Sequence, residues 1–276
     1  MKDFTNKVVV ITGAGSGIGR ELAVQFASRG AVLALNDWKQ EGLDETWNLL
    51  PPANRGYQER FDVGDRAAME AFAESVVREL DRVDVVINNA GFSVKQTPAI
   101  RSTIEDYEKT LRVNLWGVLY GSYSFLPHLR ARPEASLVNI SSIFGIYAFP
   151  GSAPYNVSKF GVRGFTETLR VEMRGTPLHV ACVHPGGIRT NIHKNVEIED
   201  PKERERFIRN FEKKSPTTAA RAAEVIIAGI EKKKGRILIG KDAWFVDKVV
   251  RMLPAKYETI LTRWLDPRKF MKESDR

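Results

Sequence analysis

The stretch KVVVITGAGSGIGRELAVQFASRGA, residues 7–31, joins an apolar run to a cluster of glycines and then to a segment with helical periodicity. The run from Val8 to Thr12 is typical of a parallel strand that is buried on both faces. Gly13, Gly17 and Gly19 follow it with the spacing GxxxGxG. Because glycine has no Cβ, such a turn lets the backbone approach a pyrophosphate, whose charge suits the N–H groups at a helix start. The order of strand, glycine turn and helix therefore predicts a dinucleotide-binding unit.

The rest of the chain alternates between apolar runs and amphipathic segments. Strands are expected near residues 7–12, 31–36, 57–61, 83–87, 136–141, 178–183 and 236–240. Helices are expected over 17–29, 41–50, 65–80, 103–130, 153–174 and 217–233. This alternation predicts an α/β protein whose parallel sheet of about seven strands is doubly wound, with helices on both faces. Ligands of such sheets bind beyond the carboxyl ends of the strands. That edge is expected to hold Thr12, Asp37, Asp62, Asn89, Ser142 and Pro185.

A tyrosine and a lysine in PYNVSKFGV have the spacing of a proton-transfer pair. Tyr155 and Lys159 stand four residues apart, so on a helix they share one face. An ammonium beside a phenol favours the phenolate, which would lower the tyrosine pKa from about 10. Ser142 ends the apolar run SLVNISS and could hold a substrate oxygen beside that phenol. The pair alone could also arise by chance on a helix, whereas all three residues together predict an acid–base site.

Seven motifs, in this order, resemble the short-chain dehydrogenase/reductase family over roughly residues 5–240. They are TGAGSGIG at 12–19, Asp62-Val63, NNAG at 88–91, Asn114 in RVNLWG, Ser142 in NISS, YNVSK at 155–159 and HPGGIRT at 184–190. The resemblance implies one Rossmann-type domain, residues 1–241, that both binds a dinucleotide and performs catalysis. It also implies a catalytic tetrad: Asn114, Ser142, Tyr155 and Lys159. In the family, the asparagine supports a water that relays protons from the lysine.

The same resemblance implies the residues that contact the cofactor. They are Gly13, Ser16, Gly17, Ile18, Gly19, Asp37, Asp62, Val63, Asn89, Ala90, Gly91, Tyr155, Lys159, Pro185, Gly186, Ile188 and Thr190. Two of these positions have structural alternatives. Asp62 could touch the adenine or merely cap a turn, and residues 88–91 could bind ligand or hold sheet edges together. The segment 185–190 resembles the one that receives the nicotinamide carboxamide.

Asp37, at the end of the run AVLALND, bears on the choice of nicotinamide cofactor. In the family this position meets the adenosine ribose, where a carboxylate accepts from the hydroxyls and repels a 2′-phosphate. Relatives that prefer NADP usually place Arg or Lys just after it or inside the glycine turn. Trp38 and Ser16 occupy those two places, although Lys39 follows. NAD is therefore expected, with NADP the less favoured cofactor.

The reaction implied is hydride transfer with acid–base help. Ser142 and Tyr155 would hold the oxygen of a secondary alcohol or ketone, and the Tyr155 phenolate would take the alcohol proton. Lys159 would lower the tyrosine pKa and grip the nicotinamide ribose. Two alternatives stay open: a catalytically silent relative that senses dinucleotide or binds a partner, and an NADP-dependent carbonyl reductase.

Composition and length narrow the protein class further. A chain of 276 residues that is 43% hydrophobic can bury one α/β core. The single Cys182 excludes an internal disulfide, and the four histidines show no ligand spacing, so no metal site is expected. The start MKDFTNKVVV has no charged and apolar leader, and no run approaches the ~18 apolar residues of a membrane-spanning helix. These features predict a cytoplasmic protein, and no nucleic-acid-binding module is recognisable.

The last quarter of the chain carries the whole positive excess. Residues 201–276 hold 20 Lys/Arg against 11 Asp/Glu, whereas the first 200 residues hold 22 against 23. Apolar residues recur there at helical spacing: Trp244, Phe245, Val249, Met252, Leu253, Tyr257, Ile260, Leu261, Trp264 and Leu265. Pro254 suits the first turn of a second helix. Residues 242–276 are therefore expected to form a basic extension of two short amphipathic helices.

Three interpretations of residues 242–276 stay open. The helices could pack on the body or on a second subunit, since a homo-oligomer, dimer or tetramer, is expected. They could lie on an anionic membrane surface, which would make the protein peripheral there. They could also form a lid over an apolar substrate.

The substrate is expected to be lipophilic. Apolar side chains that could line a pocket beside Ser142 are Phe92, Ile143, Phe144, Ile146, Tyr147 and Phe149. A charged segment from His193 to Thr218 would form a flap over this pocket. The pattern favours a steroid, retinoid or long-chain hydroxy compound over a small hydrophilic alcohol.

Overall fold

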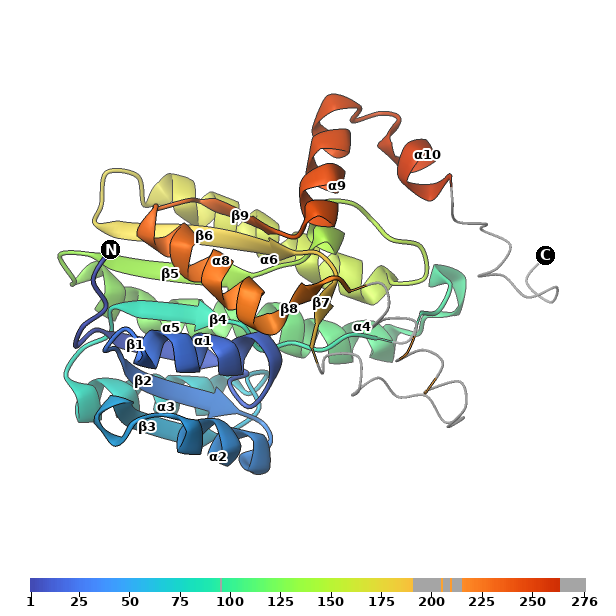
Figure 1. Cartoon of the computed structure of the whole chain (residues 1–276). Coiled ribbons are helices and arrows are strands. Elements are labelled where there is room, and N and C mark those ends of the chain that lie inside the picture. The colour runs from blue at the N-terminus through green and yellow to red at the C-terminus, as the bar shows by residue number, and fades with distance from the viewer. Residues whose placement is uncertain (95, 191–204, 206–208, 210–214, 264–276) are drawn as a thin grey trace.

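The computed structural model describes residues 1–94, 96–190, 205, 209 and 215–263 (Figure 1). Its strands are β1 (Val8–Thr12), β2 (Val32–Asp37), β3 (Arg55–Arg60), β4 (Val85–Asn88), β5 (Ala135–Ile140), β6 (Leu178–Pro185), β7 (Ile188–Arg189), β8 (Thr217–Thr218) and β9 (Arg236–Ile239). Its α-helices are α1 (Gly17–Ala27), α2 (Gln40–Leu49), α3 (Arg66–Leu80), α4 (Ile104–Leu111), α5 (Gly117–Arg130), α6 (Ala153–Glu172), α8 (Ala219–Glu231), α9 (Lys241–Met252) and α10 (Tyr257–Thr262). Single 3₁₀ turns lie at Pro52–Asn54, Ala99–Arg101 and Ile143–Gly145, and Arg112–Trp116 is a π-helical turn.

Seven strands form one sheet in the order β3-β2-β1-β4-β5-β6-β9, and every pair in it is parallel. This confirms the expected α/β class and the parallel sheet of seven strands. The chain moves outward from β1 to β3 and then returns to the other side of β1 as β4. The carboxyl ends of β1 and β4 therefore flank a topological switch point, where ligands of such sheets bind.

Helices cover both faces of the sheet, as Figure 1 shows. α1 packs against α8 and α2 on one face, and α3 packs against α5 on the other. The strand β1 serves both cores, because Val9 and Ile11 belong to one apolar cluster and Val8 and Val10 to the other. Alternate side chains of a strand point to opposite faces. The unbroken apolar run at the beginning of the chain is thus explained by burial on both sides.

The helix expected over residues 103–130 is interrupted in its middle. Thr103 begins α4 with a capping box that it shares with Asp106. The helix then widens into the π-helical turn Arg112–Trp116 before α5 continues to Arg130. Such π-turns are frequent at functional sites, and this one contains Asn114. The helix expected over 217–233 begins later, at Ala219, because Thr217 and Thr218 pair with β7 and Thr218 caps α8.

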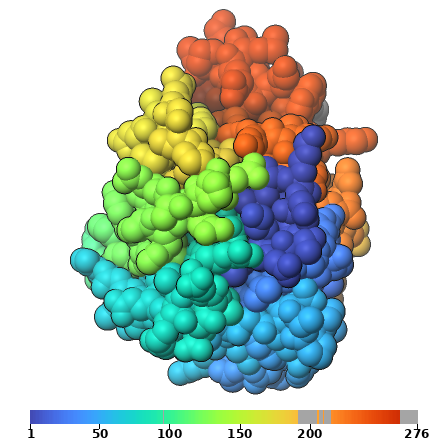
Figure 2. All heavy atoms as spheres, turned by 90° about the vertical axis from the view of Figure 1, so that its left-hand side faces the viewer, coloured from blue at the N-terminus to red at the C-terminus, as the bar shows by residue number. Residues whose placement is uncertain are grey.

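Two short helices follow β9, as expected from the apolar spacing. They stand out from one end of the molecule, coloured red in Figures 1 and 2. The expectation about Pro254 is wrong: α10 begins only at Tyr257, and Leu253 stays bonded to α9 through its N–H to Val249 O. Pro254 therefore lies in the turn between the helices. Within the described ranges, no helix is both long and apolar enough to cross a membrane.

Parts of two expected features lie outside the described residues. The flap expected from His193 to Thr218 is described only at 205, 209 and from 215 onward. Trp264 and Leu265, expected to end the apolar stripe of the extension, also lie outside the described residues.

Candidate active site

The glycine turn between β1 and α1 depends on the absence of side chains. Gly13 and Gly17 have φ of +65° and +54°, which side chains rarely tolerate. A Cβ on Gly19 would lie 2.1 Å from the carbonyl oxygen of Gly13. A Cβ on Gly17 would lie 3.1 Å from Cβ of Thr190, so this turn meets the segment that follows β6. Ser16 holds the N-cap position of α1 without using its side chain as the cap. The turn is thus a bare backbone cradle of the kind that a pyrophosphate needs.

Asp37 is fixed at the carboxyl end of β2, behind this turn. It is 8% exposed, and its Oδ2 accepts from the Gly15 N–H at 2.8 Å. Its Oδ1 accepts from the Lys39 N–H at 3.0 Å. Arg20, which sequence reasoning missed, lies close by and donates to the Gly15 carbonyl and to Glu45. The position of Arg20 in the sequence, three residues after Gly17, was the only feature that could have indicated it. In the structure its guanidinium pairs with Glu45 at 2.5 Å.

A cleft of about 860 Å³ opens over these residues, within the ~300–1,000 Å³ that is typical of cofactor sites. The expected cofactor residues that line it are Gly13, Ser16, Gly17, Ile18, Asp37, Asp62, Val63, Asn89, Ala90, Gly91 and Thr190. Among the described residues, the lining does not include Gly19, Tyr155, Lys159, Pro185, Gly186 and Ile188. The side chain of Ile188 is buried in the core. The cradle and the cleft together fit a dinucleotide.

The polar residues after β3 and β4 form hydrogen bonds that hold the neighbouring backbone in place. Asp62 caps its own turn by accepting from the Gly64 N–H, and it pairs with Arg112 at 2.7 Å. Asn89 donates to the carbonyls of Thr12 and Gly13 and so ties β4 to β1. Asp62 and Asn89 also line the cleft. The binding and the structural interpretations of these residues are therefore compatible.

Ser142, Tyr155 and Lys159 meet beyond the carboxyl end of β5. Ser142 follows that strand, is 8% exposed, and accepts from the Phe144 N–H at 3.1 Å. Tyr155 and Lys159 lie one turn apart on α6, and Ser142 is near enough to the phenol to act on its pKa. Lys159 Nζ lies 5.7 Å from the centre of the Tyr155 ring and donates to the carbonyl of Ile140 at 3.1 Å. The three side chains predicted from the sequence therefore share one site.

The pKa of Tyr155 does not follow the expectation from the sequence. Burial raises the pKa of Tyr155 to about 12, and the Ser142 hydroxyl only partly opposes this. Burial also lowers the pKa of Lys159 to about 8. The low-dielectric surroundings penalise the charged form of each group. Burial therefore moves the pKa of Tyr155 away from neutral pH and that of Lys159 toward it.

Asn114 is completely buried, and both the oxygen and the nitrogen of its amide are hydrogen-bonded. Its Oδ1 accepts from the N–H of Phe92, and its Nδ2 donates to the carbonyl of Phe92, both at 2.9 Å. Gly91 lies beside it: a Cβ there would be 3.0 Å from Asn114 Oδ1 and 3.4 Å from Lys159 Nζ. The asparagine thus holds the loop after β4 against the lysine.

His184, at the end of β6, supports the serine from behind. Its Nδ1 lies 3.0 Å from the carbonyl oxygen of Ser142. A carbonyl can only accept, so Nδ1 carries the proton. Burial lowers the pKa of His184 to about 4, which keeps the imidazole neutral. Sequence reasoning missed this residue, although it stands directly before Pro185 in the HPGGIRT motif.

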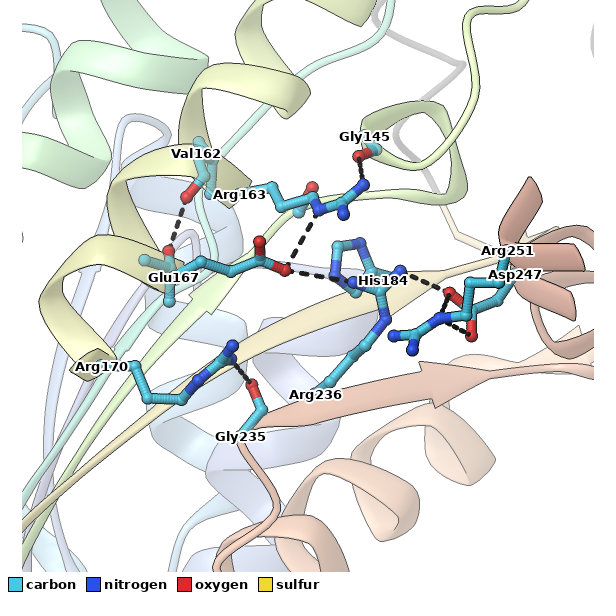
Figure 3. A network of polar contacts seen from close by, with 12 residues as sticks. Gly145, Val162, Arg163, Glu167, Arg170, His184, Gly235, Arg236, Asp247 and Arg251 are labelled. Atoms are coloured by element: carbon cyan, nitrogen blue, oxygen red, sulfur yellow. Dashed lines mark hydrogen bonds and ion pairs between the residues drawn. The ribbon is translucent and has the colours of Figure 1, made fainter. Parts of the chain in front are cut away.

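A chain of charged residues continues this support to the C-terminal helices (Figure 3). Arg163 donates to the carbonyl of Gly145, in the turn after Ser142, and to Glu167. Arg236 of β9 bridges Glu167 at 3.2 Å and Asp247 of α9 at 2.5 Å. Sequence reasoning missed the whole chain. Only the spacing of Arg163 and Glu167, four apart on a helix, was a local signal.

The apolar segment after Ser142 packs partly against the C-terminal helices. Ile146 and Tyr147 are buried in a cluster with Val246 of α9, so they do not line an open pocket as expected. Phe144 stacks on Phe149 at 4.8 Å, and its ring lies 6.0 Å from that of Tyr155. Phe92 lines the cleft. The apolar side chains around the site therefore form two groups: one lies beside Tyr155 or on the cleft, and the other is buried under α9.

Comparisons with known proteins agree with this fold. The family described as short chain dehydrogenase matches residues 7–201. SadH of Mycobacterium tuberculosis, named as an oxidoreductase, is 39% identical over 265 residues, which cover 95% of this chain and 96% of SadH. A solved short chain dehydrogenase/reductase from Burkholderia phymatum, in complex with NAD, has a TM-score of 0.81 at 26% identity, over 95% of this chain and 97% of that one. Serine dehydrogenase complexed with NADP+ has a TM-score of 0.75 at 27% identity, over 84% and 93%.

The chain belongs to the short-chain dehydrogenase family, as its motifs predicted. It is a nucleotide-binding oxidoreductase built on a Rossmann fold.

Proposed function

We propose that this protein transfers a hydride between NAD(H) and a lipophilic secondary alcohol or ketone, with Tyr155 as the general acid–base. One observation carries the proposal: Ser142, Tyr155 and Lys159 meet at the edge of the sheet, and Gly91 packs between Lys159 and Asn114. The nicotinamide, when bound, supplies the hydride acceptor or donor. Everything else in the reaction is placement and proton transfer by the protein.

The residues divide the proton chemistry among them. Ser142 and Tyr155 hold the substrate oxygen, and Tyr155 takes the hydroxyl proton as the alcohol is oxidised. Because the phenol is itself protonated at neutral pH, Tyr155 passes its own proton to the neutral amine of Lys159 as it takes the proton of the alcohol. Lys159, with its pKa lowered to about 8, then releases the proton toward solvent. Asn114 keeps Gly91 and Phe92 in place beside the lysine. In reduction the same groups return the proton to the ketone oxygen.

The cofactor would lie along the cleft. Gly13, Gly17 and Gly19 would hold the pyrophosphate, Asp37 the adenosine ribose, and residues 185–190 the nicotinamide end. A buried carboxylate at the ribose supports NAD over NADP. Arg20 is the nearest cation to the turn, and its pairing with Glu45 also disfavours recruitment by a 2′-phosphate. The alternative is an NADP-dependent carbonyl reductase, in which Arg20 would have to turn from Glu45 toward the 2′-phosphate.

Aromatic side chains near Ser142 support a lipophilic substrate. Phe144 and Phe149 stack beside Tyr155, and Phe92 lies on the cleft wall. Such surfaces favour apolar over hydrophilic alcohols. The test is a screen of steroid, retinoid, long-chain and short polar alcohols with NAD and with NADP, read at the NADH absorbance. Turnover of an apolar secondary alcohol with NAD is expected. Binding of NADH without any turnover would favour the silent relative.

The outer face of α9 supports a further part of the proposal, which is contact with an anionic membrane surface by a cytoplasmic protein. Trp244, Phe245 and Met252 are exposed there, and Lys248 lies over the Trp244 ring at 5.5 Å. The acids of the helix, Asp242 and Asp247, turn inward to Gly187 and Arg236. Cations with aromatics suit a lipid headgroup layer. A second copy of this chain, in a dimer or tetramer, is the competing occupant.

Sedimentation with vesicles separates these two occupants. The full chain should pellet with anionic vesicles at low salt and not with neutral ones, because its cations need charged headgroups. Added salt should weaken the pelleting, because it screens this attraction within about 10 Å at 0.1 M. Trp244→Ala with Phe245→Ala should abolish pelleting. A change of oligomeric state in that variant, with no vesicle binding by the full chain, would assign the face to a subunit contact.

A further inference from the structure

Asp242, in the first turn of α9, reaches back to the segment that follows β6. Its Oδ2 accepts a hydrogen bond from the Gly187 N–H at 2.7 Å. Its Oδ1 is buried and has no hydrogen-bond partner in the described part of the chain. A carboxylate in such a place is costly unless it holds something in position.

Two glycines make room for this carboxylate. A Cβ on Gly186 would lie 2.2 Å from Oδ2 of Asp242, and one on Gly240 would lie 2.3 Å from Oδ1. Gly240 also has φ of +99°, which directs the chain from β9 into α9. Residues from β6 and from the β9–α9 junction are therefore shaped around one side chain.

The hydrogen bond from Gly187 completes the use of the backbone donors in residues 185–187. Pro185 has no N–H, and the Gly186 N–H donates to the carbonyl of Ile239 at 2.9 Å. No peptide bond in the described chain is cis, so the Gly186 carbonyl points opposite to the Gly187 N–H and away from Asp242. The Gly187 carbonyl accepts from the Thr217 N–H at 3.4 Å, whereas the Gly186 carbonyl is the acceptor whose direction Asp242 sets.

We propose that Asp242 is a positioning residue for the nicotinamide end of the cofactor. The inference rests on the proposed function, in which residues 185–190 receive the nicotinamide carboxamide, a donor of N–H groups. Asp242 fixes the peptide between Gly186 and Gly187, and it acts through that peptide rather than on the cofactor itself. The adenine end would be held by the glycine turn and Asp37, whose carboxylate accepts from the N–H groups of Gly15 and Lys39. The domain boundary expected after residue 241 therefore falls between residues 185–190 and Asp242, the residue that positions them.

Binding of two ligands to the full chain tests this positioning role. NADH contains the nicotinamide, whereas ADP-ribose is the same molecule without it. Asp242→Ala should weaken NADH binding about tenfold, the effect of losing one buried hydrogen bond, and leave ADP-ribose binding within about twofold. Asp242→Asn keeps an oxygen that can accept from Gly187, so it should recover most of the NADH affinity. Glu258→Gln, which removes an exposed acid from α10, is the matched control and should bind both ligands normally.

The outcomes separate this inference from the proposed function. NADH binding that is unchanged in Asp242→Ala would overturn the positioning role, and so would equal weakening of ADP-ribose. Asp242→Asn behaving like Asp242→Ala would contradict the hydrogen-bond mechanism. If the unmodified chain bound neither ligand, the proposed function itself would fail, and this inference would fail with it.

Discussion

The two halves of the candidate site, one beyond β1 and β2 and the other beyond β5 and β6, are held in place by different groups. The end under β1 and β2 is made of backbone: Gly13, Gly17 and Gly19 leave a bare turn, and the Asp37 carboxylate is fixed by the N–H of Gly15. The end under β5 and β6 is held by side chains from distant elements. His184 bonds the carbonyl of Ser142, and the charged chain from Arg163 to Asp247 links the next turn to α9 (Figure 3).

This difference separates what binds from what reacts. A backbone cradle tolerates almost no substitution, because its function is the absence of atoms. A side-chain network can be altered one partner at a time, and the loss of stability is larger when the partner that remains is more deeply buried. The cofactor end should therefore fail abruptly on mutation, and the reactive end should weaken in steps.

The largest effect on cofactor binding is expected at Gly19. Gly19→Ala places a Cβ 2.1 Å from the Gly13 carbonyl, so the turn must move, and NADH affinity should fall about 100-fold. Gly164→Ala is the matched control, because a Cβ there meets nothing within 4 Å. It should keep NADH binding and gain about 0.5–1 kcal/mol of stability from the helical propensity of alanine. Titration of NADH fluorescence measures the first effect and thermal unfolding the second. Normal NADH binding by Gly19→Ala would break the contrast between the two ends.

The next effect concerns the side-chain network. Asp247 is 10% exposed and Arg236 is 17% exposed. Asp247→Ala removes one of the two carboxylates that Arg236 bridges and leaves Glu167, so it should cost roughly 2 kcal/mol of unfolding free energy, the worth of a hydrogen bond between charged groups. Arg66→Ala breaks an exposed pair with Glu70 and should cost at most about 0.5 kcal/mol. Denaturant unfolding of both variants gives the comparison. Equal costs would show that the network adds nothing beyond a surface pair.

The contrast also explains what the sequence could and could not predict. The glycine turn, the parallel sheet and the tetrad depend on local patterns such as GxxxGxG and YNVSK, so their positions were predictable. The links from Arg236 to Asp247 and from Asp242 to Gly187 join residues that no periodicity relates. The burial of Ile146 and Tyr147 under α9 was equally invisible, because an apolar side chain reads the same in a pocket and in a core. The pKa of Tyr155 was mispredicted for the same reason, since burial is a property of the fold.

The choice between NAD and NADP tests the role of Asp37 in the cradle. The unmodified protein should use NAD more efficiently than NADP, because the carboxylate of Asp37 repels a 2′-phosphate. Asp37→Ala combined with Trp38→Arg should lower the ratio of kcat/KM for NAD over NADP at least about tenfold. Trp38→Arg alone keeps the carboxylate and should change the ratio less. Equal use of the two cofactors by the unmodified protein would contradict the role of Asp37.

The smallest effect is a pH dependence at the reactive end. The lowered pKa of Lys159, about 8, means that the amine is charged below that pH and can accept a proton above it. The rate of alcohol oxidation should therefore rise with pH through about 8, while the Tyr155 pKa of about 12 adds no step in this range. Lys159→Met should lose the step. An unchanged profile in that variant would assign the titration to another group.

The most direct measurement compares binding and turnover in Tyr155→Phe. Phenylalanine keeps the ring on α6 and removes only the hydroxyl. The account predicts that this variant binds NADH within about twofold of the unmodified protein. Its turnover of the best alcohol should fall by about 10²–10⁴, the contribution of a positioned general acid–base. Undiminished turnover, with NADH binding intact, would contradict the assignment of Tyr155 as the proton-transfer group.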